Sequence, residues 1–140
     1  MSRKPEVLIS FPGGKRVDAA FRTEVVSTDQ PVDAGGEASA PAPFTLFLAS
    51  IGTCAGIYVL GFCQSRNLPT EGIRIRQRMA FDPETRVLSG VELDIEVPPT
   101  FPEKYREALV RVADQCAVKK AIQAQPEFVV RTVVVSGDAE

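Results

Sequence analysis

Residues 44–63 read FTLFLASIGTCAGIYVLGFC, twenty residues without a single charged side chain. A helix of this length and hydropathy is long enough to span a bilayer. The stretch also contains three glycines and several hydroxyl side chains, and no cluster of Lys or Arg directly precedes it. We therefore favour a helix over residues 44–67 that is buried on all sides inside a globular core, with a membrane span as the alternative.

The segments on either side of this helix indicate the rest of the fold. Alternation of apolar and polar residues predicts strands over residues 7–11, 16–26, 72–81, 87–97 and 127–135. Residues 28–43 form a long loop rich in Pro, Gly and Ala, and two helices are expected around residues 103–113 and after Cys116. Hairpins separated from helices indicate an α+β fold with antiparallel sheets. The length of 140 residues fits one domain over residues 1–140.

The charges of the predicted 72–97 hairpin alternate in a complementary way. Three arginines lie on one face of its first strand, and three acidic residues lie on the polar face of its second strand: Arg74, Arg76, Arg78, Glu92, Asp94 and Glu96. Cross-strand pairs of opposite charge stabilise a hairpin by a few tenths to about 1 kcal/mol each. We interpret these arginines as a solvated strand face.

Composition excludes several classes of function. Lys and Arg number 16 against 18 Asp and Glu, and the net charge of −2 argues against a nucleic-acid binder, which needs a basic face. The chain contains no histidine, so Ser-His and Cys-His catalytic pairs and histidine zinc sites are excluded. We expect no metal and no other cofactor. The remaining candidates for chemistry are Cys, Arg, Lys, Tyr and the carboxylates.

The first ten residues, MSRKPEVLIS, lack the apolar run of a secretory signal. We therefore expect a cytoplasmic protein, whose cysteines stay reduced. An odd number of cysteines in that compartment indicates thiol chemistry or simple packing before it indicates structural disulfides.

The three cysteines occupy different contexts. Cys54 and Cys63 lie nine residues apart on the same predicted helix. They therefore point to opposite faces, about 13 Å apart along the axis, and cannot form a disulfide with each other. Cys116 opens a short helix, with Lys119 and Lys120 one turn further on, an arrangement that favours a thiolate. Since free cysteines often only fill space, packing is the simpler interpretation for Cys63, and both interpretations stay open for Cys54 and Cys116.

Around these cysteines the sequence resembles the OsmC/Ohr family, the osmotically inducible and organic-hydroperoxide-resistance proteins. The resemblance rests on a Gly-Gly loop leading into PAPFTLFLASIGTCAGIYV at residues 41–59, and on ADQCAVKKAI at residues 113–122. It implies the OsmC-like fold, in which antiparallel sheets pack around a long buried central helix. It also implies an intertwined homodimer with two active sites at the subunit interface.

The resemblance further implies a thiol peroxidase. In that assignment Cys54 is the thiol that a hydroperoxide oxidises to a sulfenic acid, and Cys116 resolves it as a disulfide. Family members lower the thiol pKa with an arginine from the N-terminal strands, for which Arg16 and Arg22 are the two candidates. The family glutamate ten residues before the first cysteine is replaced here by Phe44. The proline that usually follows the second cysteine is replaced by Ala117.

The apolar residues around Cys54 suit an organic hydroperoxide better than hydrogen peroxide. We take Phe44, Phe47 and Tyr58 as candidate substrate-binding residues. The expected partners are a second copy of the chain, a small organic hydroperoxide and a dithiol reductant, with neither nucleic acid nor membrane. Two alternatives stay open: a non-catalytic OsmC-like dimer that binds a small apolar ligand or senses redox state, and a structural role in which all the cysteines are packing.

Overall fold

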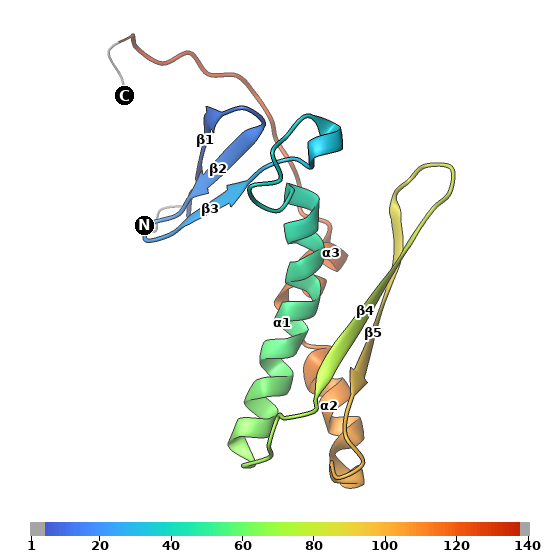
Figure 1. Ribbon diagram of the computed structural model, residues 1–140. Helices are drawn as coiled ribbons and strands as arrows, with labels where there is room; N and C mark the ends of the chain where they lie inside the picture. The colour runs from blue at the N-terminus through green and yellow to red at the C-terminus, as the bar shows by residue number, and fades with distance from the viewer. Residues whose placement is uncertain (1–4, 138–140) are drawn as a thin grey trace.

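The computed structural model describes residues 5–137 (Figure 1). A three-stranded antiparallel sheet comes first, with the strand order β1-β2-β3. A long helix, α1, links this sheet to an antiparallel hairpin and two short helices. In chain order the elements are β1 (Leu8–Gly13), β2 (Arg16–Ala20), β3 (Val25–Thr28), the 3₁₀ turn η1 (Val32–Ala34), α1 (Pro43–Ser65), β4 (Arg74–Phe81), β5 (Leu88–Glu96), the 3₁₀ turn η2 (Glu103–Tyr105), α2 (Arg106–Ala113) and α3 (Ala117–Ala124). The predicted α+β class is confirmed.

Helix α1 forms where it was predicted, but one chain covers only one stripe of it. Pro43 occupies its first turn, where the missing N–H costs nothing, and the left-handed Asn67 (φ 54°) follows its end. The buried residues are Ile51, Ala55, Val59, Phe62 and Cys63. The side chains of Phe44 and Ile57 are 50% and 60% exposed, so the expectation of burial on all sides is wrong for the single chain. The two short helices and the hairpin of one chain are too small to surround 23 residues of helix.

Helix α1 is also long and apolar enough to cross a membrane, judged by length and composition. Its buried stripe packs against α2 and the hairpin. The core consists of Ala55, Val59, Phe62, Cys63, Phe101, Leu109 and Ala113. Ile75 and Leu93 of the hairpin pack against this core from the side.

The β4–β5 hairpin is attached to α1 by one polar contact on its otherwise apolar inner face. Gln77 Nε2 donates a hydrogen bond to the Leu48 carbonyl at 2.9 Å. Gly52 allows this approach, because a Cβ atom there would lie 2.4 Å from Gln77 Oε1. On the outer face the predicted charge pairing is confirmed. Arg74 and Arg76 both bond Glu96 at 2.7 Å, and Arg78 bonds Asp94.

The N-terminal sheet differs from the prediction in one respect. Residues 16–26 were expected to be one return strand, but they form two strands joined by a tight turn. Phe21 N donates to the Glu24 carbonyl at 2.7 Å across this turn. The alternation of apolar residues continues through the turn, so periodicity alone could not reveal the break.

The long loop after β3 is ordered around one buried carboxylate, Asp29, which is 1% exposed. Its oxygens accept hydrogen bonds from Ser39 Oγ at 2.5 Å, Ser39 N at 3.0 Å and Gln30 N at 2.7 Å. These bonds, with the Ser39 hydroxyl contributing most, lower the pKa of Asp29 to about 2. Gly36 is required for this packing, because a Cβ atom there would lie 2.1 Å from the Gln30 carbonyl oxygen.

The predicted last strand, residues 127–135, is wrong for the single chain. The segment after α3 is irregular and runs away from the helices past the N-terminal sheet (Figure 1). Phe128, Val130 and Val134 are 84%, 94% and 97% exposed. A strand forms only when a neighbouring strand shares its backbone hydrogen bonds, and within residues 5–137 nothing pairs with this segment.

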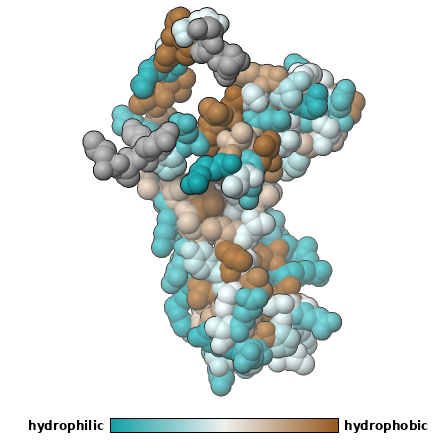
Figure 2. All heavy atoms as spheres, turned by 90° about the vertical axis from the view of Figure 1, so that its left-hand side faces the viewer, coloured by the Kyte–Doolittle hydropathy of each residue, from teal (hydrophilic) through white to brown (hydrophobic). Residues whose placement is uncertain are grey.

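Exposed apolar side chains are not confined to this segment. Figure 2 shows hydrophobic side chains on the surface of both the upper and the lower part of the molecule.

Candidate active site

The structure brings Cys54 and Cys116 together, although 62 residues separate them. Cys54 lies partly buried in the middle of α1, and Cys116 lies 2% exposed immediately before α3. The Cys116 side chain lies near enough to Cys54 to lower the pKa of the Cys54 thiol. Both cysteines are free thiols, as is Cys63. Their proximity makes Cys54 and Cys116 candidates for one disulfide.

Cys116 ties α3 to α1 through its sulfur atom. Its Sγ lies 3.9 Å from the Ile51 carbonyl oxygen of α1 and accepts a hydrogen bond from Lys119 N at 3.4 Å. Cys116 is therefore the N-cap residue of α3, with non-helical backbone angles of φ −51° and ψ 126°. Its cap satisfies one of the four N–H groups that every helix leaves without an intrahelical acceptor.

The first turn of α3 also sets the electrostatics of Cys54. Hydrogen bonds from the Val118 amide, the Cys116 thiol and the Ala117 amide lower the pKa of the Cys54 thiol, and partial burial opposes them. The amide of Val118 has the largest effect. Backbone N–H groups and the positive end of a helix both favour a thiolate. The sequence predicted that the start of this helix would favour the thiolate of Cys116; the structure shows its first-turn amides lowering the pKa of Cys54.

The amides of Ala117 and Val118 are functional groups that sequence reasoning missed. Ala and Val carry no polar side-chain atom, so their contribution left no signal in the residue types. The available signal was positional: Cys116 directly precedes a helical pattern, so the next N–H groups had to be free of intrahelical partners.

Cys63 lies apart from this pair, in the core between α1 and α2 with no exposed surface. Burial raises the pKa of its thiol, and the charge of Arg66 opposes that change. A thiol that is buried and protonated is a poor nucleophile. This environment fits the packing interpretation of Cys63.

The two candidate arginines lie in the N-terminal sheet. Arg16 is the first residue of β2, and its exposed side chain donates from Nε to the Gly13 carbonyl at 3.3 Å. Arg22 lies exposed in the turn between β2 and β3, and therefore does not share a strand face with Arg16. In the part of the chain that the structure describes, the groups that lower the pKa of Cys54 all belong to residues 116–118. An arginine at Cys54 thus stays a prediction that concerns the assembled protein.

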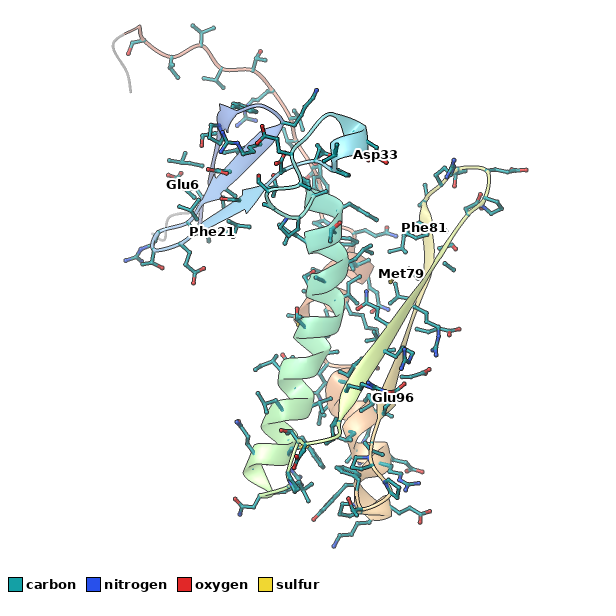
Figure 3. All side chains as sticks on the ribbon, viewed as in Figure 1. Glu6, Phe21, Asp33, Met79, Phe81 and Glu96 are labelled. Carbon is teal, nitrogen blue, oxygen red and sulfur yellow. The ribbon has the colours of Figure 1, made fainter. Side chains whose placement is uncertain are left out.

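The candidate substrate residues fall into two places. Phe44 packs on Phe47 with ring centroids 5.4 Å apart, and on Phe81 of β4 at 6.3 Å. Figure 3 shows Met79 and Phe81 on the side of β4 that faces α1. Tyr58 instead lines a shallow hollow beside Arg66 and Arg111. The described chain therefore gathers the two phenylalanines into an aromatic cluster at the start of α1 and leaves Tyr58 outside it.

A larger hollow of about 940 Å³ reaches Cys116. Its wall comes from β5, α2 and α3, and Ile51 of α1 also lines it. Most of the lining is apolar, including Val91, Leu93, Ile95, Val97, Leu109 and Ile122. Charged groups also line it, among them Arg106 and the ion pair of Asp114 with Lys119. An apolar cavity that ends at a thiol can hold an organic molecule with its polar reacting atoms against the sulfur.

Comparison with known proteins agrees with the family resemblance seen in the sequence. The family model described as OsmC-like protein matches residues 36–131. No curated protein matches the chain significantly.

Solved structures match over most of the chain. A Psychrobacter arcticus protein named for an osmotic stress induced and detoxification response is 20% identical; the match covers 86% of this chain and 90% of that one, with a TM-score of 0.69. The OsmC like protein of Mycoplasma pneumoniae is 14% identical, with 89% and 91% covered and a TM-score of 0.65. The organic hydroperoxide resistance protein OhrB of Bacillus subtilis is 18% identical, with 86% and 92% covered and a TM-score of 0.50. At these identities the likeness shows the shared fold.

Proposed function

Because the chain belongs to the OsmC-like family, we propose that it is a thiol-dependent peroxidase, which reduces organic hydroperoxides through a Cys54/Cys116 dithiol–disulfide cycle. The observation that carries this proposal is the placement of Cys116 beside the Cys54 region of α1, with its Sγ 3.9 Å from the Ile51 carbonyl oxygen. The pKa of Cys54 is lowered there, while burial raises that of Cys63. A peroxidase needs one thiol that is ionised and a second within reach of it. The names of relatives such as the organic hydroperoxide resistance protein of Bacillus subtilis support the same chemistry.

The chemistry follows from the two sulfur atoms. The Cys54 thiolate attacks the outer oxygen of the hydroperoxide; the S–O bond forms, the O–O bond breaks, and the alkoxide leaves as an alcohol after taking a proton. The Cys116 sulfur then attacks the Cys54 sulfenic acid; the S–S bond forms, the S–O bond breaks, and water leaves. A dithiol reductant restores both thiols by exchange through a mixed disulfide. No cofactor takes part in these steps.

We place the substrate in the apolar hollow that ends at Cys116, with the Phe44–Phe47 cluster and Tyr58 contributing in the assembled protein. The amides of Ala117 and Val118 would hold the developing negative charge on Cys54. Arg16 or Arg22 of a second copy would add a fixed positive charge at the same sulfur. Phe44 stands where relatives carry a glutamate, so such an arginine lacks that anchor.

The functional unit that we propose is a cytoplasmic homodimer. Many large apolar side chains of the single chain are exposed, including Phe11 at 80%, Phe128 at 84% and Val134 at 97%. Soluble monomers rarely expose apolar patches of this extent. A second copy would cover α1 and supply an edge for the segment over residues 127–135. Sedimentation equilibrium at micromolar concentration tests this; a stable monomer would contradict it.

Turnover tests the function itself. The purified chain, supplied with dithiothreitol as the dithiol, is expected to consume cumene hydroperoxide and to release the alcohol in equal amount. Cys54→Ser and Cys116→Ser are expected to abolish turnover, while Cys63→Ala is expected to retain it. Equal turnover in all three variants and in wild type would contradict the assignment.

The second candidate is a non-catalytic dimer that binds a small apolar ligand. The specific observation in its favour is Phe44, whose ring packs on Phe47 and Phe81 at the position of the family glutamate. That candidate predicts saturable binding of an apolar probe with no loss of thiols when cumene hydroperoxide is added.

A further inference from the structure

The sulfur of Cys116 has two roles. It is the atom that must bond Cys54 in the disulfide. It is also the N-cap acceptor of α3, since it receives the hydrogen bond of Lys119 N at 3.4 Å. Serine, threonine, aspartate and asparagine usually fill this position, and here a thiol does so.

Helix α3 has few other interactions to keep it folded. It is eight residues long, none of its residues is buried, and its first turn carries no acidic side chain. Isolated helices shorter than about 12–15 residues are marginal in water. Helix α3 is therefore held largely by the Cys116 cap, the Lys119–Asp114 ion pair and its packing on α1.

The same helix forms one wall of the apolar hollow. Lys119, Ile122 and Gln123 of α3 line this hollow, and Cys116 lines it too. A change at the start of α3 therefore changes access to the cavity and to the sulfur atoms. Figure 1 shows α3 lying alongside α1, apart from the N-terminal sheet.

We propose that disulfide formation between Cys54 and Cys116 removes the N-cap of α3, so that this helix acts as a redox-sensitive gate on the apolar hollow. In the reduced state the cap holds α3 against α1 and the hollow is closed on that side. Disulfide formation draws the Cys116 sulfur to within about 2.05 Å of the Cys54 sulfur, and this movement is expected to lengthen its hydrogen bond to the Lys119 amide. The first turn of α3 then loosens, and the disulfide becomes accessible to the reductant. This inference rests on the proposed cysteine pair.

The oxidation step in the test is independent of peroxidase activity. Diamide, an azo compound, takes two electrons and two protons from a pair of thiols, so one disulfide forms and the diamide becomes a hydrazine. Oxidation of the full-length protein by diamide thus produces the Cys54–Cys116 bond even if the chain does not react with hydroperoxides. A failure of the peroxidase proposal and a failure of the gate are therefore distinguishable.

Hydrogen–deuterium exchange of the α3 peptide, residues 117–124, measures the gate. We expect exchange of its first-turn amides to accelerate roughly fivefold on oxidation, the size expected for the loss of one N-cap, while α2 is unchanged. The Cys54→Ser variant keeps the cap and forms no Cys116 bond to residue 54, so diamide is expected to leave its exchange unchanged.

Two variants separate the cap from the disulfide. Cys116→Ser keeps an N-cap acceptor and Cys116→Ala does not, and neither can form the bond. We expect slow exchange in Cys116→Ser, as in the reduced wild type, and fast exchange in Cys116→Ala, as in the oxidised wild type. Equal exchange in the two variants would overturn the proposal. The proposal would also be overturned if α3 exchanged as slowly in the verified disulfide as in the reduced protein. It would likewise be overturned if diamide formed no Cys54–Cys116 bond.

Discussion

Replacement of Ala117 by proline removes one hydrogen bond from the Cys54 sulfur and leaves the helix intact. Ala117 is the first residue of α3, and its N–H bonds the Cys54 thiol. Proline is well tolerated at the first helical position, where the N–H has no intrahelical acceptor. The residue before it, Cys116, already has the extended ψ of 126° that a following proline requires.

The size of the effect can be worked from the geometry. A hydrogen bond to a charged group contributes about 1.5–3 kcal/mol. Cys54 is only partly buried, and the Ala117 amide has the smallest effect of the three groups that lower its pKa, so the lower end is an upper limit here. About 1.4 kcal/mol corresponds to a tenfold smaller thiolate population at a pH below the thiol pKa. A more basic thiolate is intrinsically more nucleophilic, with a Brønsted coefficient of about 0.4–0.5. This raises the rate constant of each remaining thiolate about threefold and so offsets part of the tenfold loss. The net expectation is a roughly threefold slower reaction of Cys54 near neutral pH.

The assay is the rate of carboxamidomethylation of Cys54 by iodoacetamide as a function of pH, followed by peptide mass. Ala117→Ser is the matched control, since it changes the side chain and keeps the N–H. We expect the pH profile of Ala117→Pro to move to higher pH and that of Ala117→Ser to coincide with wild type. Identical profiles for proline and serine, with α3 intact by hydrogen exchange, would refute the role of this amide.

Three further variants test other parts of the account. Asp29 has a pKa of about 2 in the fold against an ordinary 3.8, so its contribution to stability is present above about pH 4 and is lost as the pH falls toward 2. The midpoint temperature of thermal unfolding should therefore change less between about pH 4 and pH 2 in Asp29→Asn than in wild type. Leu109 is 1% exposed in the core, and Leu109→Ala should cost about 3 kcal/mol in urea unfolding, against less than about 1.5 kcal/mol for Leu109→Met. Cys63→Ala should lower stability by about 1 kcal/mol through lost packing, yet leave the iodoacetamide rate of Cys54 unchanged; a slower Cys54 would show that Cys63 belongs to the site.

Patterns in the sequence correctly predicted the helices and strands that are specified by their own residues. The uncharged stretch predicted α1, and alternation with complementary charges such as Arg74 and Glu96 predicted the hairpin and its cross-strand ion pairs. The start of α3 at Ala117 followed from the pattern after Cys116. In each case, the residues that specify the element also lie within it.

Two predictions were wrong for the single chain because they depend on contacts that one copy of the chain does not supply. The segment over residues 127–135 has the composition of a strand but no edge to pair with in the described chain. Helix α1 has an apolar surface all round, yet one chain buries only the stripe that includes Ala55 and Val59. The break between β2 and β3 is different: the pattern continued through the turn, and only the Phe21–Glu24 hydrogen bond reveals it.

The candidate site was predictable in its side chains and unpredictable in its backbone. The resemblance paired Cys54 with Cys116, and the structure brings Cys116 near enough to lower the pKa of Cys54. The amides of Ala117 and Val118 also lower that pKa, and no residue type could indicate them. Of the two arginines that the resemblance suggests, Arg16 lies in β2 and Arg22 in the turn after it, so the role of either stays a prediction.

The central claim is that Cys54 and Cys116 form one redox pair from which Cys63 is excluded. The most direct test adds one equivalent of tert-butyl hydroperoxide to the reduced protein, blocks the remaining thiols with iodoacetamide and maps the peptides by mass. We expect a single disulfide between Cys54 and Cys116, with Cys63 recovered in the alkylated form. A disulfide that contains Cys63, or full alkylation of all three cysteines after the peroxide, would contradict it.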